Sequence, residues 1–561
     1  MLSTTRTDWK ELLPEFEEKT AAFYAGTLSK GDYKGFSGLY GSYAQRGGEA
    51  SMLRLRMTGG RVTKEKLKFV ADAIRAYQID LVHFTNCSTI QLHNLNERAV
   101  CELLAQALDA GIVTMGGGGD FPRNVTASPL SGVEAGEYFD VLPWAEAAGD
   151  YLLGFILAEK MPRKLKVGFS NSPANATHVT FRDLGFAARP DGTFDVYSAG
   201  GLGSNPCMGV KVAEGVQPDQ ILYYIKAMWL TFRAYGDYKN RGRARTRYMQ
   251  EKLGGPEAYK AAFLEKLQEV YDSGENLTLA VETAGAETGG AAAAQRDGTC
   301  RAGISAAANP AGVCSAAAGN ETTGEWTVSL RTVTKTGDGT TASDRRILAQ
   351  KQPGLYAVVW HPLGGKPDPE SICRLCDTIA DMEDVELRLS PDGGAYIINL
   401  TGAEAERVLA AVPDSAQSFF ETSVSCIGAS ICQVGIRDSE QLLADCAAAV
   451  RAANLPDGVL PQIHISGCPS SCGTHQIGRL GFRGAAKSVN GKSQPAYLLT
   501  VNGSDRQGEE CFGREVAVLL ETQIPGFLVR LGQTVAAAGV DFETWFAKNP
   551  EGIDALVAEF V

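Results

Sequence analysis

Two pairs of cysteines have a spacing that suits an inorganic cluster. Cys426 and Cys432 are separated by five residues, Cys468 and Cys472 by three, and 35 residues lie between the pairs. Four thiolates form the ligand set of a 4Fe–4S cluster. Zinc also accepts four thiolates, but its cysteine pairs usually stand closer together on tight turns. The wider first pair favours an iron–sulfur cluster over zinc, and over four cysteines that are simply buried.

The second cysteine pair lies at the end of an apolar, alternating segment. Residues 463–473 read Ile-His-Ile-Ser-Gly-Cys-Pro-Ser-Ser-Cys-Gly, which predicts a strand that runs into a Gly/Pro/Ser turn. Such turns expose backbone N–H groups, and these can donate hydrogen bonds to cluster sulfurs. The segment therefore suits a metal-binding turn.

A pair of lysines predicts an anion site. Lys164 and Lys166 alternate along a predicted strand, so both side chains face the same side. Two like charges on one face repel each other unless an anion lies between them. A solvated edge strand is the alternative interpretation.

The composition excludes several classes of protein. The chain has 561 residues, 44% apolar and 21% charged, with a net charge of −12. This acidity argues against nucleic acid as a partner. No apolar run reaches the length of a membrane span, and the N-terminus has no apolar signal core, so we expect a cytoplasmic protein with no membrane contact. The 13 cysteines then indicate metal or redox chemistry more than disulfides.

An internal repeat predicts a duplicated chain. Gly59-Gly60 matches Gly364-Gly365 and Asn94-Leu95 matches Asn399-Leu400, each pair 305 residues apart. A strand and helix pattern connects the matched points in both copies, as in half of a split βαβ domain. We expect an α+β fold with a pseudo-twofold axis, two ferredoxin-like repeats, and two larger α/β segments that bind cofactors.

The repeat sets the expected domain boundaries. The ranges are an N-terminal arm at 1–50, a first repeat at 51–115, a first large segment at 116–350, a second repeat at 351–415, and a second large segment at 416–561. Residues 284–343 are rich in Ala, Gly and Thr and are predicted to form a surface excursion or loops over a cofactor.

The motif Cys426-x5-Cys432 with Gly467-Cys468-Pro-Ser-Ser-Cys472-Gly473 resembles the signature of siroheme-dependent sulfite and nitrite reductases, and the duplicated organisation resembles that family too. The resemblance implies a siroheme and a 4Fe–4S cluster, with Cys472 bound to the cluster and bridging to the siroheme iron. It implies six-electron reduction of sulfite to sulfide, or of nitrite to ammonia.

The resemblance also implies a substrate pocket. Arg123, in the segment Asp120-Phe-Pro-Arg-Asn-Val125, matches the family's substrate-contacting arginine, and Lys164 and Lys166 match its lysine pair. This lysine pair favours sulfite. Further residues are predicted to contact the siroheme: Arg54, Arg56, Gln91, His93, Asn124 and Cys472.

One position departs from the family pattern. The family has an arginine and a glutamine where this chain has Cys87 and Ser88. Loss of the arginine removes a positive charge and a bidentate donor from the pocket. Cys87 is predicted to be a catalytic residue, acting as a proton donor, a covalent partner or a space-filling group, and these roles stay open.

No nucleotide site is predicted. Gly200-Gly-Leu-Gly203 lacks the later glycine and the acidic residue of a dinucleotide fold, so a ferredoxin or a separate reductase subunit is the expected electron donor. The alternative function, from a different class of protein, is that of a non-catalytic iron–sulfur electron-transfer subunit.

Three further features have open interpretations. A basic run from Arg241 to Arg247 is predicted on a helix, as a carboxylate-binding or ferredoxin-docking surface or a solvated face. Cys373 and Cys376 are predicted to be core residues. The pair Cys300 and Cys314 is only a weak metal site.

Overall fold

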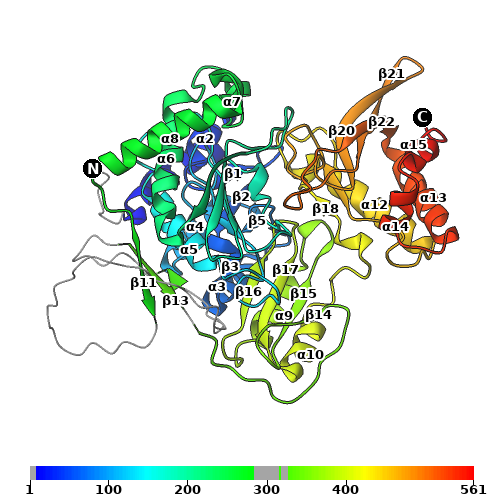
Figure 1. Cartoon of the computed structure of the whole chain (residues 1–561), viewed down its shortest axis with the longest axis horizontal. Coiled ribbons are helices and arrows are strands. Elements are labelled where there is room, and N and C mark those ends of the chain that lie inside the picture. The colour runs from blue at the N-terminus through cyan, green and yellow to red at the C-terminus, as the bar shows by residue number, and fades with distance from the viewer. Residues whose placement is uncertain (1–7, 284–314, 317–325, 331) are drawn as a thin grey trace.

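The computed structural model describes residues 8–283, 315–316, 326–330 and 332–561. Cys300 and Cys314 lie outside these residues. None of the described helices is long and apolar enough to cross a bilayer. Figure 1 shows the two repeats side by side, with the second large segment extending away from them toward the C-terminus.

The first repeat is a four-stranded antiparallel sheet in the order β1-β2-β5-β4, covered by α3 and α4. Its elements are β1 (Ser42–Ala44), β2 (Ser51–Arg56), α3 (Lys64–Tyr77), β4 (Val82–Phe84), β5 (Thr89–Leu95) and α4 (Glu97–Asp109). Leu53, Leu55 and Leu92 face the helices and join the core. Because side chains alternate across a strand, Arg54 and Gln91 lie on the opposite face.

The second repeat has the same strand order. Its elements are β14 (Ile347–Ala349), β15 (Tyr356–Trp360), α9 (Pro369–Thr378), β16 (Glu386–Leu389), β17 (Ala395–Leu400) and α10 (Gly402–Ala411). The sheet order is β14-β15-β17-β16-β3, in which β3 (Arg61–Val62) comes from the first repeat. Strands β1 and β14 show that each repeat begins slightly before the boundaries predicted at 51 and 351.

The residues that marked the repeat adopt the same backbone conformation in both copies. Gly59 and Gly364 both have φ of 64°, and Asn94 and Asn399 have φ of 55° and 61°. These left-handed conformations favour Gly and Asn. In both copies a glutamine at the edge strand donates a hydrogen bond to the asparagine. Gln45 Nε2 lies 2.9 Å from Asn94 Oδ1. The matching glutamine, 305 residues later, has its Nε2 atom 3.4 Å from Asn399 Oδ1. The predicted duplication is confirmed.

The two large segments also share one topology. Three parallel strands lead into two antiparallel strands, in the orders β6-β7-β8-β9-β10 and β18-β19-β20-β21-β22. The first set is β6 (Thr126–Ala127), β7 (Val167–Ser170), β8 (Leu184–Ala188), β9 (Phe194–Ser198) and β10 (Val210–Val216). The second set is β18 (Val424–Ser425), β19 (Ile463–Ser466), β20 (Leu480–Val489), β21 (Lys492–Val501) and β22 (Arg514–Leu520).

Helices cover these two sheets. The first large segment contains α5 (Leu142–Leu153), α6 (Ile221–Tyr235), α7 (Tyr248–Leu253) and α8 (Pro256–Asp272). The second contains α11 (Gly428–Ile431), α12 (Ser439–Ala452), α13 (Ile524–Ala537), α14 (Phe542–Lys548) and α15 (Gly552–Val557). Each sheet has its own hydrophobic core.

The N-terminal arm and the excursion lie outside the duplicated plan. The arm contains α1 (Leu13–Tyr24) and α2 (Lys30–Ser37). The described part of the excursion forms a small sheet with β11 (Leu279–Thr283), β12 (Ser315–Ala316) and β13 (Trp326–Leu330). The Trp326 ring packs edge-on against Tyr151 of α5 at 5.3 Å between centroids, so this part rests on the outer side of the first large segment (Figure 1).

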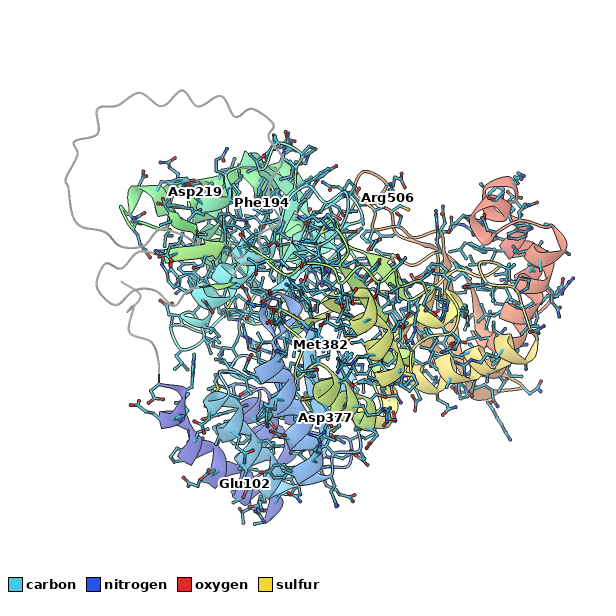
Figure 2. The ribbon with its side chains drawn as sticks, turned by 90° about the horizontal axis from the view of Figure 1, so that it is seen from below. Glu102, Phe194, Asp219, Asp377, Met382 and Arg506 are labelled. Atoms are coloured by element: carbon cyan, nitrogen blue, oxygen red, sulfur yellow. The ribbon has the colours of Figure 1, made fainter. Side chains whose placement is uncertain are left out.

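Buried and exposed ion pairs join the two repeats. Arg61 Nε lies 2.8 Å from Glu386 Oε1 in the buried interface, and the hydrogen bonds and charge of Glu386 raise the pKa of Arg61 despite its burial. Arg75 of α3 donates to Asp377 of α9 at 2.7 Å, at the contact between repeats that Figure 2 shows near Asp377 and Met382. Cys373 is buried in this interface, as predicted for a core residue.

Candidate anion and cluster site

Neighbouring parallel strands bring the four predicted cluster cysteines to one edge of the C-terminal sheet. Cys426 directly follows β18, and Cys468 follows β19 after one glycine. Because β18 and β19 pair in parallel, their carboxyl ends meet at the same edge. Cys432 ends the short helix α11 that begins two residues after Cys426, and Cys472 lies in the turn after Cys468.

The thiols lie in a polar turn and influence one another. The Gly467 N–H donates to Cys426 Sγ at 3.3 Å, and Ser439 Oγ lies 3.1 Å from the same sulfur. Burial, and then the charge of Cys472, raise the pKa of Cys426 to about 11. Burial also raises the pKa of Cys472, with Cys468 and Cys432 contributing. Ionised thiolates therefore need a cationic partner here, which an iron cluster supplies.

Among the described residues, the four thiols do not form a compact ligand group for a single ion. Across the described residues, no three His, Cys, Asp or Glu side chains come together closely enough to hold one metal ion. A tetrahedral zinc site would require such a group. The strand geometry and the N–H donor at Cys426 fit a larger cluster held by Cys426, Cys432, Cys468 and Cys472.

A backbone bridge in the first large segment positions the basic residues Arg123, Lys164 and Lys166. Pro122 and Leu165 form an isolated parallel bridge, and the Arg123 N–H donates to the Leu165 carbonyl at 2.8 Å. Lys164 and Lys166 flank Leu165 and so share a side, as predicted. They precede β7, which begins at Val167, and belong to this bridge instead of a regular strand.

In the described part of the chain, the two lysines have no counter-ion. Neither ammonium group has a hydrogen-bond or ion-pair partner among the described residues. Burial and the charges of Lys166, Arg245 and Arg123 lower the pKa of Lys164 well below its ordinary value, whereas Cys472 opposes this shift. The positive charge of the first half therefore lies within electrostatic reach of Cys472 in the second half.

Arg123 is held by carbonyls of the glycine run. Its Nη1 atom donates to Gly117 O and its Nη2 atom donates to Gly119 O at 2.7 Å, while Nε is buried without a partner among the described residues. Burial, and then the charge of Arg54, lower the pKa of Arg123 to about 10. A Cβ added at Gly118 would lie 2.6 Å from the Tyr43 hydroxyl, so the run packs against β1 of the first repeat.

Arg54 and Arg56 organise the segment that carries Arg123. Arg54 Nη1 donates to Gly117 O. Arg56 donates to Met115 O at 3.2 Å and to Pro122 O and Arg123 O at 3.0 Å each, and burial lowers its pKa to about 9. The structure thus gives Arg56 three backbone acceptors of its own, which leaves little capacity for a siroheme carboxylate.

Asn124 connects Arg123 to position 87. Its Nδ2 atom donates to Met57 O at 2.8 Å, Cys87 O at 2.9 Å and Ser88 O at 3.0 Å, while Oδ1 is buried without a partner in the described residues. The amide fixes the turn at Cys87 beside the arginine segment.

Gln91 and His93 lie on a buried polar face of the first repeat. Gln91 Oε1 lies 3.2 Å from His83 Nδ1, and His93 Nδ1 lies 3.2 Å from Gln45 Oε1. The Nε2 atoms of both histidines are buried without partners in the described part of the chain. Burial lowers the pKa of His83 to about 4 and of His93 to about 3, so both rings are neutral at pH 7. The sequence analysis did not select His83.

Cys87 is surrounded by cations. Burial alone raises its pKa, but the charges of four basic side chains outweigh this effect and lower the pKa to about 6. These cations are Lys166, Arg182, Arg54 and Lys164. The predicted pocket residues therefore come together around position 87.

Arg182 and Arg245 were missed as pocket residues. Arg182 precedes β8 and Arg245 precedes α7. The run Arg241–Arg247 was wrongly predicted as a regular helix: it forms a 3-10 turn at Arg241–Arg243 followed by a bend. Arg241 pairs with Asp120, and Arg245 pairs with the buried Asp183, so the run serves several separate contacts.

The pocket has surplus donors that fit an anionic cofactor. Around this pocket, buried guanidinium nitrogens without partners among the described residues occur on Arg123, Arg182, Arg245 and Arg247. Unpaired buried donors and charges are costly. Siroheme carboxylates and an oxyanion substrate would satisfy them, so the residues present fit siroheme.

Turns from both halves close around this region. Gln476 Nε2, which follows the cysteine turn, donates to Gly203 O at 2.6 Å. His178 Nδ1 lies 2.5 Å from Asp505 Oδ2, and the Gln507 N–H donates to Pro173 O at 3.0 Å. Figure 2 shows Arg506, between these two contacts, where the C-terminal half faces the first large segment.

The two cofactor-facing turns are structural copies. Segments 167–188 and 463–484 align 296 residues apart, with β7 matching β19 and β8 matching β20. Asn175 and Ser471 both have positive φ, 51° and 55°. Ser172 and Ala176 stand where the second copy has Cys468 and Cys472. Only the second turn can therefore supply cluster thiolates.

Two family models match the first half of the chain. Residues 43–110 match the nitrite/sulfite reductase ferredoxin-like half domain, and residues 118–270 match the nitrite and sulphite reductase 4Fe-4S domain. The four cysteines lie beyond both matched ranges. Their assignment depends on the duplicated topology and on the motif.

Similar proteins cover most of the chain. A ferredoxin–nitrite reductase of Synechococcus elongatus is 24% identical over 474 residues, covering 81% of this chain and 80% of that protein. A protein named sulfite reductase [ferredoxin] 1 of Mycolicibacterium paratuberculosis is 21% identical over 487 residues, covering 83% and 75%. The structure of the Mycobacterium tuberculosis NirA protein has the same fold, with a TM-score of 0.72, 19% identity, and coverage of 97% and 95%.

These matches and the duplicated fold identify the class of protein. The matched domains, the duplicated fold and the similar proteins all support the siroheme-dependent sulfite and nitrite reductase family. It is an oxidoreductase with siroheme and a 4Fe–4S cluster as its cofactors.

Proposed function

We propose that the protein reduces sulfite to sulfide with six electrons. The observation that carries this proposal is the position of Lys164 and Lys166, which have no protein counter-ion in the described chain and lie within electrostatic reach of Cys472. Their charges, with that of Arg123, favour a dianion over a monoanion. The pocket is thus built to hold a small, strongly charged oxyanion.

The protein residues have separate tasks in this proposal. Cys426, Cys432, Cys468 and Cys472 hold the cluster, and Arg54, Gln91, His93 and Asn124 contact the siroheme. When bound, siroheme supplies an iron that accepts the substrate, and the cluster supplies electrons one at a time. Lys164, Lys166 and Arg123 bind the substrate oxygens and stabilise their negative charge.

The lysines also suit proton delivery. Burial and neighbouring charges lower the pKa of Lys164 well below its ordinary value, so this ammonium gives up a proton more readily than an exposed lysine. Each oxygen that leaves the substrate as water requires protons at the substrate oxygen, and Lys164 is placed to donate them.

Nitrite is the second candidate substrate. Cys87 replaces a guanidinium with a small side chain, which suits a smaller monoanion. A similar protein of Synechococcus elongatus is named ferredoxin–nitrite reductase. Reduction of nitrite to ammonia would use the same residues.

The electron donor in this proposal is a ferredoxin or a separate reductase subunit. Similar proteins are named for ferredoxin, and another is named the hemoprotein beta-component of an NADPH sulfite reductase. The net charge of −12 would oppose long-range attraction of an acidic donor, so a local basic patch would have to guide it.

The absorption spectrum and reductase activity of the purified holoenzyme test the proposal directly. Purified protein should absorb in the red as siroheme proteins do, and with reduced viologen it should form sulfide from sulfite, consuming six electrons per sulfide. A brown protein without the red band or either reductase activity would indicate the electron-transfer subunit instead. Ammonia formation from nitrite without sulfide formation would establish the second candidate.

A further inference from the structure

Arg182 is a buried arginine that has no carboxylate partner within the described ranges. Its side chain is 8% exposed, and Nε donates to Thr177 O at 2.7 Å. Nη2 is buried without a hydrogen-bond partner among the described residues. The adjacent carboxylate of Asp183 is engaged elsewhere, because it accepts from Thr246 Oγ1, Arg245 Nη2 and the Lys166 N–H.

Arg182 and Cys87 lie within electrostatic reach of each other. Among the charges acting on Arg182, Cys87 comes before Asp183. Among the cations acting on Cys87, Arg182 comes second, after Lys166. The backbone gives the same placement, because the Lys166 N–H donates to Asp183, the residue next to Arg182, at 2.8 Å.

Position 87 is where the family resemblance places an arginine. An arginine there would add a guanidinium next to Arg182, Lys166 and Lys164, and like charges at such a site repel. Cys87 has a small side chain and no guanidinium. Arg182 therefore has room in the pocket and is repelled by one cation fewer. The chain thus retains the number of cations around the pocket but brings one of them from a different segment, the turn before β8.

We propose that Arg182 binds the oxyanion substrate and replaces the guanidinium that position 87 lacks. This inference rests on the proposed function, because it assigns a further substrate-binding residue to the same pocket. The unpartnered Nη2 atom is the group that would donate to a substrate oxygen, with the charge assistance that makes such bonds strong.

Anion affinity of the holoenzyme tests the proposal. Sulfite is titrated into the Arg182→Gln holoenzyme, and binding is measured from the change in siroheme absorption. Carbon monoxide serves as an uncharged control ligand, and siroheme content is measured in each sample. We expect the sulfite Kd to rise about tenfold or more, the scale of one charge-assisted hydrogen bond, while carbon monoxide affinity stays the same.

Arg346→Gln is the matched control. Arg346 also donates to backbone carbonyls, Val412 O at 2.8 Å and Leu409 O at 3.2 Å, but it lies in the second repeat. Its sulfite affinity should equal that of the wild type.

A swapped variant separates substrate binding from a structural role. Cys87→Arg alone should lower siroheme content, because it crowds cations. Cys87→Arg combined with Arg182→Gln should regain sulfite affinity to within about threefold of the wild type, a strongly non-additive result. Simple loss of packing at Arg182 would not be repaired by an arginine at another position.

Three outcomes would overturn the proposal. One is unchanged sulfite affinity in Arg182→Gln. Another is a loss of siroheme with normal sulfite affinity at the occupied sites, which would assign Arg182 to a cofactor carboxylate. The third is a swapped variant that binds sulfite no better than Arg182→Gln, or that fails to load siroheme. A wild-type protein that reduces neither anion would instead refute the proposed function, before any variant is made.

Discussion

The guanidinium of Arg46, next to strand β1, lies 3.0 Å from the carbonyl oxygen of Cys432 and 2.7 Å from that of Gly435. The Arg46 N–H also donates to Ile431 O at 3.1 Å, and Gln433 donates to Ala44 O. The first repeat therefore holds the loop that carries one predicted cluster thiol, although the two are almost 400 residues apart.

Arg46→Ala should make the cluster more labile. The change removes two hydrogen bonds with a charged donor, worth about 1.5–3 kcal/mol each when formed, and frees the loop at Cys432. We expect severalfold faster bleaching of the cluster absorbance in air with a chelator. Arg98→Ala, which removes an exposed pair with Glu102, should bleach at the wild-type rate. Equal bleaching rates in the wild type and both variants would show that the contact of Arg46 with the loop at Cys432 does not protect the cluster.

Cys432→Ser should lose most of its iron and acid-labile sulfide, because a hard alkoxide is a poor ligand for a soft iron–sulfur cluster. The measurement is chemical iron and sulfide per chain. Cys207→Ser, at a half-buried thiol of the first large segment, should retain both. A Cys432→Ser protein with full iron and an unaltered spectrum would refute the ligand assignment.

Glu440→Gln should change how stability depends on pH. Burial raises the pKa of Glu440 to about 7, although Lys366, 2.8 Å away, opposes the shift. The pKa of this carboxyl is higher in the folded state than the value of 4.5 expected in the unfolded state. Its ionisation therefore destabilises the fold as the pH rises from 4.5 through 7. Its ionisation costs the wild type a few kcal/mol, at about 1.4 kcal/mol per pH unit. The glutamine variant avoids that loss.

Thermal unfolding of both proteins at pH 5 and pH 8 checks this prediction. The Tm of Glu440→Gln relative to the wild type should be higher at pH 8 than at pH 5. A constant difference between the two proteins would mean that Glu440 does not titrate in this range.

Lys164→Ala and Lys166→Ala should each raise KM for sulfite or lower kcat by about tenfold or more, the effect of one lost charge-assisted contact. Steady-state kinetics with a viologen donor provides the measurement. Lys492→Ala, on an exposed part of β21, serves as the control. Wild-type kinetics in both pocket variants would place these lysines outside the substrate site.

The duplicated fold could be predicted because its markers are backbone requirements. Gly59, Gly364, Asn94 and Asn399 all occupy left-handed conformations, so their residue types are restricted wherever the repeat occurs. The cysteine motif was equally informative, since a cluster turn requires both thiols and small residues. Local sequence was sufficient for both features.

The remaining pocket residues depend on tertiary packing. Arg182 and Arg245 enter from a 3-10 turn and a bend, and no local pattern indicates that either faces Cys87 or Lys164. One signal was available: the match between 167–188 and 463–484, 296 residues apart, places Arg182 just beyond the copy of the cluster turn. The approach of charges from separate segments of the chain cannot be read from spacing alone.

Competition between the two anions tests the central claim most directly. Holoenzyme receives equal concentrations of sulfite and nitrite with viologen reduced electrochemically, because dithionite itself releases sulfite. Sulfide and ammonia are then measured in the same sample, and the ratio of their initial rates equals the ratio of the two kcat/KM values. A pocket formed by Lys164, Lys166, Arg123 and Arg182 predicts that sulfide forms faster than ammonia. Faster formation of ammonia, or no sulfide at all, would contradict the account.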